Sequence, residues 1–141
     1  PLSVIPSGLS LVTGVLDKRF GFWSQPPEIR QRFINRLYKA LTDLLLRFHS
    51  DWTEGRIDKN KVKIVHYDRI MQNFDQLMPE VLDFINHSPS DELHKDIKTT
   101  AENQRNFKSG HNYDLEKFGL SAKKIRKDCA AIYTTFLNSE N

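Results

Sequence analysis

The sequence predicts a mainly α-helical fold with about five helices and one short strand. Along most of the chain, apolar residues recur at steps of three and four, which is the period of an amphipathic helix. Only residues 62–67 are short, β-branched and bounded by polar residues, as a strand would be. Glycine, proline and capping residues mark the ends of these segments and so predict their order.

Residues 1–26 combine helix-breaking residues with many apolar ones, so we expect an irregular apolar segment that packs on another part of the protein. From Pro27 the pattern becomes helical. It predicts one long helix over residues 27–54, started by Pro26 and Pro27 and ended by Gly55. Its predicted apolar face consists of Ile29, Phe33, Leu37, Leu41, Leu44, Leu45, Phe48 and Trp52.

The predicted strand at residues 62–67 has no obvious partner in the chain. A lone strand cannot satisfy its own backbone donors and acceptors. Either a partner strand lies within residues 1–25, or the partners lie outside this chain. Because the sequence also lacks an initiator methionine, we expect it to be about half of a larger protein.

Three helical segments follow the strand. Residues 74–85 predict a helix that Pro79 kinks or divides. Ser90 begins the next helix, residues 106–113 predict a loop, and Ser121 begins the last helix. We expect residues 1–141 to form a single, incomplete domain. The last helix is predicted to bury Ile125, Cys129, Ile132, Tyr133, Phe136 and Leu137.

The composition places the chain among globular proteins. Of its 141 residues, 38% are hydrophobic and 28% are charged, which excludes a collagenous or wholly disordered chain. The net charge of +3 does not indicate nucleic-acid binding. No apolar stretch reaches the ~20 residues of a membrane span. A single cysteine and the lack of a secretory signal predict a soluble cytoplasmic protein.

The sequence indicates neither a catalytic group nor a metal site. The five histidines lack the spacing of metal ligands, and neither an HExxH nor a CxxC pattern occurs. Cys129 lies on an apolar helix face and is expected in the core, although a Cys–His nucleophile pair stays open.

One loop has the composition of an anion site. It combines two cationic side chains with a hydroxyl group, an imidazole and a glycine that exposes backbone N–H groups. Such groups can hold a phosphate or a sulfate through charge-assisted hydrogen bonds. A polar surface connector is the alternative interpretation. The candidate residues are Arg105, Lys108, Ser109, Gly110 and His111.

Two stretches resemble sulfotransferases of the bacterial and phage type. Residues 62–86 resemble a strand, a box (here Tyr67–Asp68–Arg69–Ile70) and a helix of that family. Downstream, a basic loop, a Tyr-x-Leu element and Phe118–Gly119–Leu120 precede a closing helix, as in the family's carboxy-terminal signature. The resemblance covers about residues 60–138. The downstream positions that match are Lys108, Ser109, His111, Tyr113, Leu115, Phe118, Gly119 and Leu120.

The resemblance implies the carboxy-terminal half of an α/β protein with a parallel sheet flanked by helices. It also implies 3′-phosphoadenosine 5′-phosphosulfate as the sulfonate donor, with no metal. The donor's 3′-phosphate would be held by the candidate loop: Arg105, Lys108, Ser109 and Gly110, with His111 beside them.

The chain also departs from the family pattern. It lacks the phosphosulfate-binding loop, the Arg-Asp-Pro box and the usual catalytic base, so we expect no sulfonate transfer by this chain alone. Nothing in it identifies the acceptor. The alternative is a non-enzymatic helical interaction module, in which the apolar amino-terminal segment and the long helix pair with a partner or with a second copy of the chain. A homo-oligomer would form through the apolar amino-terminal surface and the unpaired strand.

Overall fold

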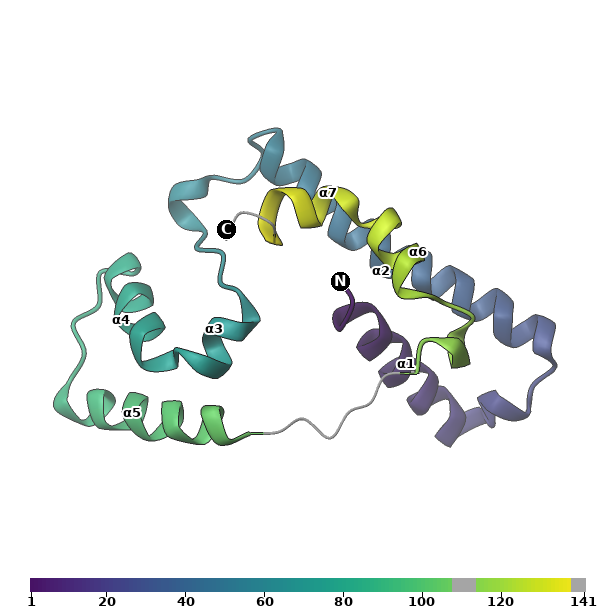
Figure 1. The fold of residues 1–141 in the computed structure, drawn as a ribbon, viewed down its shortest axis with the longest axis horizontal. Coiled ribbons are helices and arrows are strands. Elements are labelled where there is room, and N and C mark those ends of the chain that lie inside the picture. The colour runs from purple at the N-terminus through teal and green to yellow at the C-terminus, as the bar shows by residue number, and fades with distance from the viewer. Residues whose placement is uncertain (108–113, 138–141) are drawn as a thin grey trace. The chain divides into compact units, whose positions relative to one another are not determined.

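The computed structural model describes residues 1–107 and 114–137, and these are mainly helical (Figure 1). Short turns connect the helices: η1 (Phe22–Ser24), η2 (Lys59–Lys61) and η3 (Glu116–Phe118), with a π-helical turn, η4 (Tyr133–Leu137), after α7. The helices are α1 (Val4–Phe20), α2 (Pro27–Thr53), α3 (Tyr67–Gln72), α4 (Phe74–Phe84), α5 (Asp91–Asn106), α6 (Ala122–Asp128) and α7 (Ala130–Ile132).

The predicted strand is wrong, and so is the predicted half of an α/β fold, since the described residues contain no strand. Residues 62–66 instead connect η2 to α3. Val62 has extended backbone angles (φ −133°, ψ 116°), but within the described part of the chain no backbone hydrogen bond joins residues 62–65 to another segment. A strand requires such a partner, and residues 4–20, one place where a partner was expected, are helical.

The chain divides into two compact units. Unit 1 comprises residues 1–56 together with the carboxy-terminal residues from 111 onward, and unit 2 comprises residues 57–110. Each unit has its own buried apolar residues. In unit 1 these are Ile5, Leu9, Phe22, Ile34, Tyr38, Phe118, Leu120, Ile125, Cys129 and Ile132.

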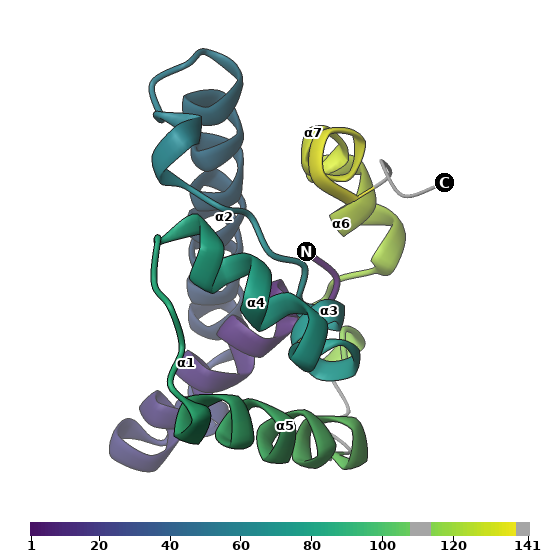
Figure 2. The ribbon, with the colours of Figure 1, turned by 90° about the vertical axis from the view of Figure 1, so that its left-hand side faces the viewer.

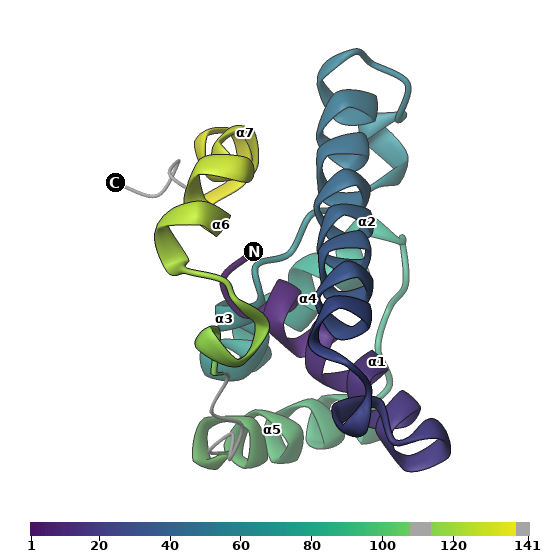
Figure 3. The ribbon, with the colours of Figure 1, turned by 90° about the vertical axis from the view of Figure 1, so that its right-hand side faces the viewer.

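Helix α1 corrects the expectation that residues 1–26 are irregular. Its 17 residues pack against α2 (Figure 3). Pro6 is tolerated because it lies in the first turn. Gly8 faces α2 so closely that a Cβ atom there would lie 3.0 Å from Leu41 Cδ1. The glycine that suggested a break therefore allows the two helices to approach, and Gly21 ends α1 at a φ of 58°.

Helix α2 ends within one residue of its predicted carboxy terminus. The residues that it buries, however, differ from the apolar face that the sequence predicts. Its most buried residues are Ile34, Tyr38 and Thr42, at four-residue spacing. Ile29 and Leu44, both predicted to face the core, are exposed. Both α1 and α7 contact α2 (Figure 1). The most buried residues of α2 therefore lie on the side of the helix between these two neighbours.

The carboxy-terminal segment is not the single helix that the sequence predicts. It comprises α6, α7 and η4, with Cys129 (φ −109°, ψ 21°) between the first two. Ile125 and Ile132 are buried as expected, whereas Leu137 is exposed. Cys129 is also fully buried, which agrees with the expected core position.

Unit 2 contains α3, α4 and α5, which pack against one another (Figure 2). Its buried residues are Leu77 and Leu82 of α4 with Ile97 and Ala101 of α5. Pro79 lies inside α4, and the helical path is instead interrupted at Asn73, between α3 and α4.

Candidate functional site

The predicted anion loop lies mostly outside the described residues. This applies to Lys108, Ser109, Gly110 and His111. Arg105, in the last turn of α5, is described, and its guanidinium group is already engaged: Nη2 lies 2.5 Å from Asp75 Oδ2, and Nε donates to the Gln72 carbonyl oxygen at 3.2 Å. This hydrogen bond with Arg105 holds the pKa of Asp75 below its usual value. Asp75 therefore competes with any phosphate for the Arg105 side chain.

The motif that follows the loop forms an ordered turn in unit 1. Asp114 Oδ1 accepts hydrogen bonds from the backbone N–H groups of Glu116 and Lys117, at 2.9 and 3.2 Å. Gly119 then takes a left-handed conformation with φ of 65°, which places Phe118 and Leu120 in the core on either side of it. The Phe-Gly-Leu motif thus anchors the start of α6.

A cluster of polar groups, of which Tyr38 is the buried member, joins α2 to α6. The Tyr38 hydroxyl donates to Asp128 Oδ2 at 2.7 Å, and Lys124 Nζ lies 2.7 Å from the same oxygen. Burial and the adjacent Asp128 carboxylate raise the pKa of Tyr38. Hydrogen bonds from Lys124 and Tyr38 lower the pKa of Asp128. The cluster is therefore an ionised carboxylate held by a cation and a neutral phenol.

No local sequence pattern predicts this cluster. Tyr38 and Asp128 are 90 positions apart, and no short motif connects them. Two features could have directed attention to them: a tyrosine within an amphipathic helix, and an aspartate four residues after a lysine on α6.

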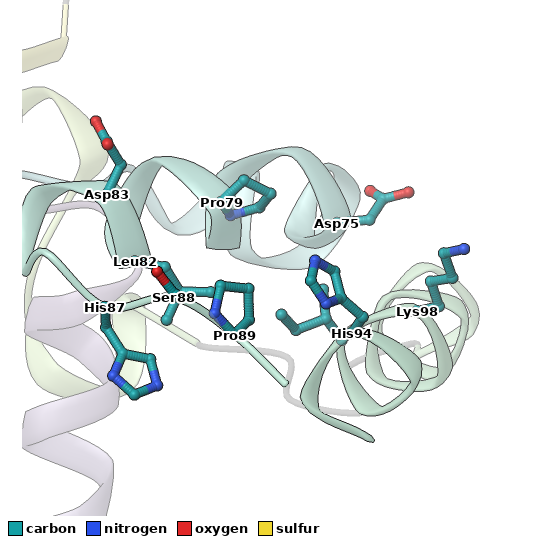
Figure 4. Close-up of a pocket in the computed structure, with 10 residues that line it drawn as sticks. Asp75, Pro79, Leu82, Asp83, His87, Ser88, Pro89, His94 and Lys98 are labelled. Atoms are coloured by element: carbon teal, nitrogen blue, oxygen red, sulfur yellow. The ribbon is translucent and has the colours of Figure 1, made fainter. Parts of the chain in front are cut away.

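A cavity of about 460 Å³ lies in unit 2, along α4 and α5 (Figure 4). The buried side chains of Leu82 and Ile97 contribute to its lining. His94 and two prolines, Pro79 and Pro89, border it, whereas Asp83 and His87 point away from its centre (Figure 4). His94 Nδ1 lies 3.0 Å from the Ser90 carbonyl oxygen.

This cavity offers little chemistry. Asp75, at the edge of the cavity, is already paired with Arg105. Among the described residues, no hydrogen bond joins the imidazole of His94 to a carboxylate. Within residues 1–107 and 114–137, no group of three or more His, Cys, Asp or Glu side chains could hold a metal ion. The cavity can accept a small apolar group, but it lacks the groups of an active site.

One histidine lies within reach of a hydroxyl group in unit 1. His49 Nε2 is 2.8 Å from Thr135 Oγ1, which connects α2 to η4. A nucleophile pair of this kind needs a third group that orients the base, and no carboxylate bonds the second ring nitrogen within the described part of the chain. Because the Phe136 ring also packs edge-on against His49, the contact has a structural role.

The surface of α1 is unusually apolar. Val4, Leu11 and Val15 lie on one face of the helix, and their side chains are 57%, 69% and 55% exposed. The opposite face carries the fully buried Ile5 and Leu9. No charged residue occurs in α1 before Asp17. We call Val4, Leu11 and Val15 the α1 stripe.

No model of a known protein family matches this chain, and no curated protein sequence or solved structure matches it. None of the described helices is long and apolar enough to cross a membrane.

Proposed function

We propose that the chain is a helical interaction module that binds a partner protein through the α1 stripe. The observation that carries the proposal is the exposure of Val4, Leu11 and Val15 on one face of α1, a helix without a charged residue before Asp17. An apolar helix face is normally covered by another part of a folded protein, whereas this face of α1 is exposed. The partner is expected to present an apolar groove to the stripe.

Burial of the α1 stripe would contribute enough free energy to affect the affinity for a partner. Burying a Val or Leu side chain completely contributes about 1.5–3 kcal/mol, and more than half of each stripe side chain is available for burial. Ordering the interface consumes part of this gain. Removal of one stripe side chain is therefore expected to weaken binding by about tenfold, which corresponds to ~1.4 kcal/mol.

Site-specific photo-crosslinking tests the proposal. A photoreactive amino acid replaces Leu11 in one variant and the exposed Ser10 in a control variant, because Ser10 lies about 100° around the helix from Leu11. Crosslinking is carried out in the cells that make the protein, and the adducts are identified by mass spectrometry. We expect one discrete adduct from position 11 only, and the purified partner should bind Leu11→Gln at least tenfold more weakly.

Equal adducts from positions 10 and 11, or unchanged affinity of the Leu11→Gln variant, would contradict the proposal. The thermal stability of Leu11→Gln serves as a control for folding. Because the Leu11 side chain is mostly exposed, this variant should unfold at nearly the same temperature as the unsubstituted chain.

A second proposed function is a contribution to a sulfonate-donor site in a sulfotransferase-like protein. The observation in its favour is local: the Phe118–Gly119–Leu120 motif forms a buried turn directly before α6, in the order that the resemblance implies. On this proposal the loop from Arg105 to His111 contacts the 3′-phosphate of 3′-phosphoadenosine 5′-phosphosulfate. The chain alone would transfer no sulfonate, because its sequence lacks a phosphosulfate-binding loop and a catalytic base.

Calorimetric titration with adenosine 3′,5′-bisphosphate tests this second proposal. Lys108→Ala is expected to weaken binding, and Lys95→Ala, on an exposed position of α5, is the matched control. Asp75→Asn releases the Arg105 guanidinium from its ion pair and should strengthen binding. The absence of heat at millimolar ligand would overturn the donor-site proposal and leave the interaction module unaffected.

A further inference from the structure

Two cations lie at the carboxy-terminal end of the α1 stripe. Lys18 and Arg19 follow Val15 by three and four residues, so they share its face of α1. Both side chains are exposed, and neither forms an ion pair with a carboxylate among the described residues. Asp17, the one acidic residue of α1, is directed to Trp23, whose backbone N–H donates to Oδ1 at 2.9 Å. The apolar face of α1 therefore ends in two exposed positive charges.

Gly14 lies at the edge of the α1 stripe, one turn beyond Leu11, and packing within the described chain does not explain it. A Cβ atom on Gly14 would lie in open space, with no packing contact within 4 Å among the described residues. Glycine destabilises a helix interior relative to alanine, because it loses more conformational freedom on folding. The missing Cβ atom of Gly14 gives close access to the α1 backbone from outside the chain.

These two observations describe what would cover the α1 stripe. Cations that border an apolar face match carboxylates that border a complementary apolar face. A helix presents apolar and acidic side chains on one side at the same spacing, and it can approach another helix closely where a glycine lacks the Cβ atom. We propose that the partner of the α1 stripe is an acidic amphipathic helix, which crosses α1 at Gly14 and places carboxylates against Lys18 and Arg19. This inference rests on the proposed function of the stripe.

The charges of α1 argue against a second copy of the chain as the occupant. Parallel pairing of two α1 helices would bring Lys18 and Arg19 of both copies together. Antiparallel pairing would place them at the amino-terminal end of the other α1, where the helix dipole is also positive. Neither arrangement supplies a carboxylate on this face, because Asp17 is engaged with the Trp23 backbone.

Two synthetic helical peptides serve as probes for the full chain. Both are three heptads long and share a seam of leucines, but the residues that flank the seam are glutamates in one peptide and lysines in the other. Like charges along each peptide oppose its pairing with itself. Binding is measured by fluorescence anisotropy. We expect saturable binding of the glutamate peptide, weakening as salt is added, and no binding of the lysine peptide.

Gly14→Ala separates stability from binding. It should raise the melting temperature, because alanine favours a helix interior, and it should weaken binding of the glutamate peptide about fivefold or more, because the new methyl group blocks close approach. Ser10→Ala, at an exposed position of the same helix, is the matched control. It also favours the helix but adds no atom, so it should bind normally.

Neutralisation of the two cations tests the charge match. Lys18→Gln combined with Arg19→Gln should weaken binding of the glutamate peptide about three- to tenfold, the loss expected for two exposed ion pairs, and should reduce its salt dependence. Lys95→Gln combined with Lys98→Gln removes the same charge from exposed positions of α5 and should bind normally.

Three results would overturn the inference: equal binding of the two peptides, no binding of the glutamate peptide, or unchanged affinity of both Gly14→Ala and the neutralised variant. Binding of the chain to phosphatidylserine vesicles together with equal peptide affinities would assign the face to a membrane and would also overturn it. The crosslinked partner distinguishes this failure from failure of the proposed function. Weaker binding of Leu11→Gln alone would keep the stripe as an interface and exclude the acidic helix, whereas unchanged binding of Leu11→Gln would contradict the proposed function itself.

Discussion

The two leucines of α1 provide the clearest test of how this helix is oriented. Leu9 is fully buried, whereas Leu11, two residues further along, is 69% exposed. Substitution of each by alanine makes the same chemical change on opposite faces of one helix. The difference between the two variants therefore measures burial alone.

The expected magnitudes follow from these exposures. Leu9→Ala removes a buried side chain and leaves a cavity among Ile5, Phe22 and other core residues, which costs about 2–5 kcal/mol of unfolding free energy. Leu11 buries only about a third of its side chain. At ~2 kcal/mol for complete burial, its loss amounts to ~0.6 kcal/mol, and the higher helix propensity of alanine offsets ~0.2 kcal/mol.

Urea unfolding followed by tryptophan fluorescence is the appropriate assay. Both tryptophans, Trp23 and Trp52, belong to unit 1, so the signal reports the unit that contains α1. We expect a large decrease in the urea midpoint for Leu9→Ala and a small one for Leu11→Ala, with similar slopes. Equal destabilisation by the two substitutions would refute the reasoning, because it would mean that the stripe is already covered in the isolated chain.

Three further predictions concern a turn and two ionisable groups. Gly119→Ala places a Cβ atom on a residue with φ of 65°, so it should lower the stability of unit 1 by about 1–2 kcal/mol in urea unfolding; an unchanged midpoint would contradict this. Because burial and Asp128 raise the pKa of Tyr38, the folded state keeps the phenolic proton after the unfolded chain loses it. Stability should therefore fall above about pH 10, and Tyr38→Phe should reduce this fall, as alkaline unfolding curves would reveal. Arg69 and Lys63 lower the pKa of Glu80 to about 2, so the stabilising effect is present above about pH 4.3 and is lost as the pH falls toward 2. Glu80→Gln should flatten the acid dependence of unit 2, measured by circular dichroism, and an unchanged profile would contradict the role of this ion pair.

Local sequence patterns predicted the elements that depend on local interactions. The period of apolar residues and the proline at its start were sufficient for α2, because both act within a few residues. Local patterns predict the wrong structure for residues 1–26, because a glycine such as Gly8 normally indicates a break in a helix. Its actual role depends on Leu41, which is 33 positions away and is brought close only by tertiary packing.

The segment at residues 62–66 illustrates the opposite error. Its β-branched residues favour extended backbone, and Val62 does have extended angles. A strand, however, is defined by its hydrogen-bonded neighbour, and the described residues supply none. Propensity therefore predicted the local conformation but not the secondary structure.

The candidate sites were harder to predict than the helices. The Tyr38–Asp128 hydrogen bond joins α2 to α6. No sequence pattern around either residue indicates that the other is its partner. Arg105 was predicted as a phosphate ligand from its neighbours in the chain, but its ion pair with Asp75 arises from the packing of unit 2. The role of Lys108 stays a prediction.

The affinity of the crosslinked partner for variants of the α1 stripe tests the central claim most directly. We predict that Leu11→Gln binds at least tenfold more weakly than the unsubstituted chain, whereas Ser10→Gln, on another face of the same helix, binds equally well. Equal affinities for all three proteins would contradict the claim that the exposed face of α1 is an interaction surface.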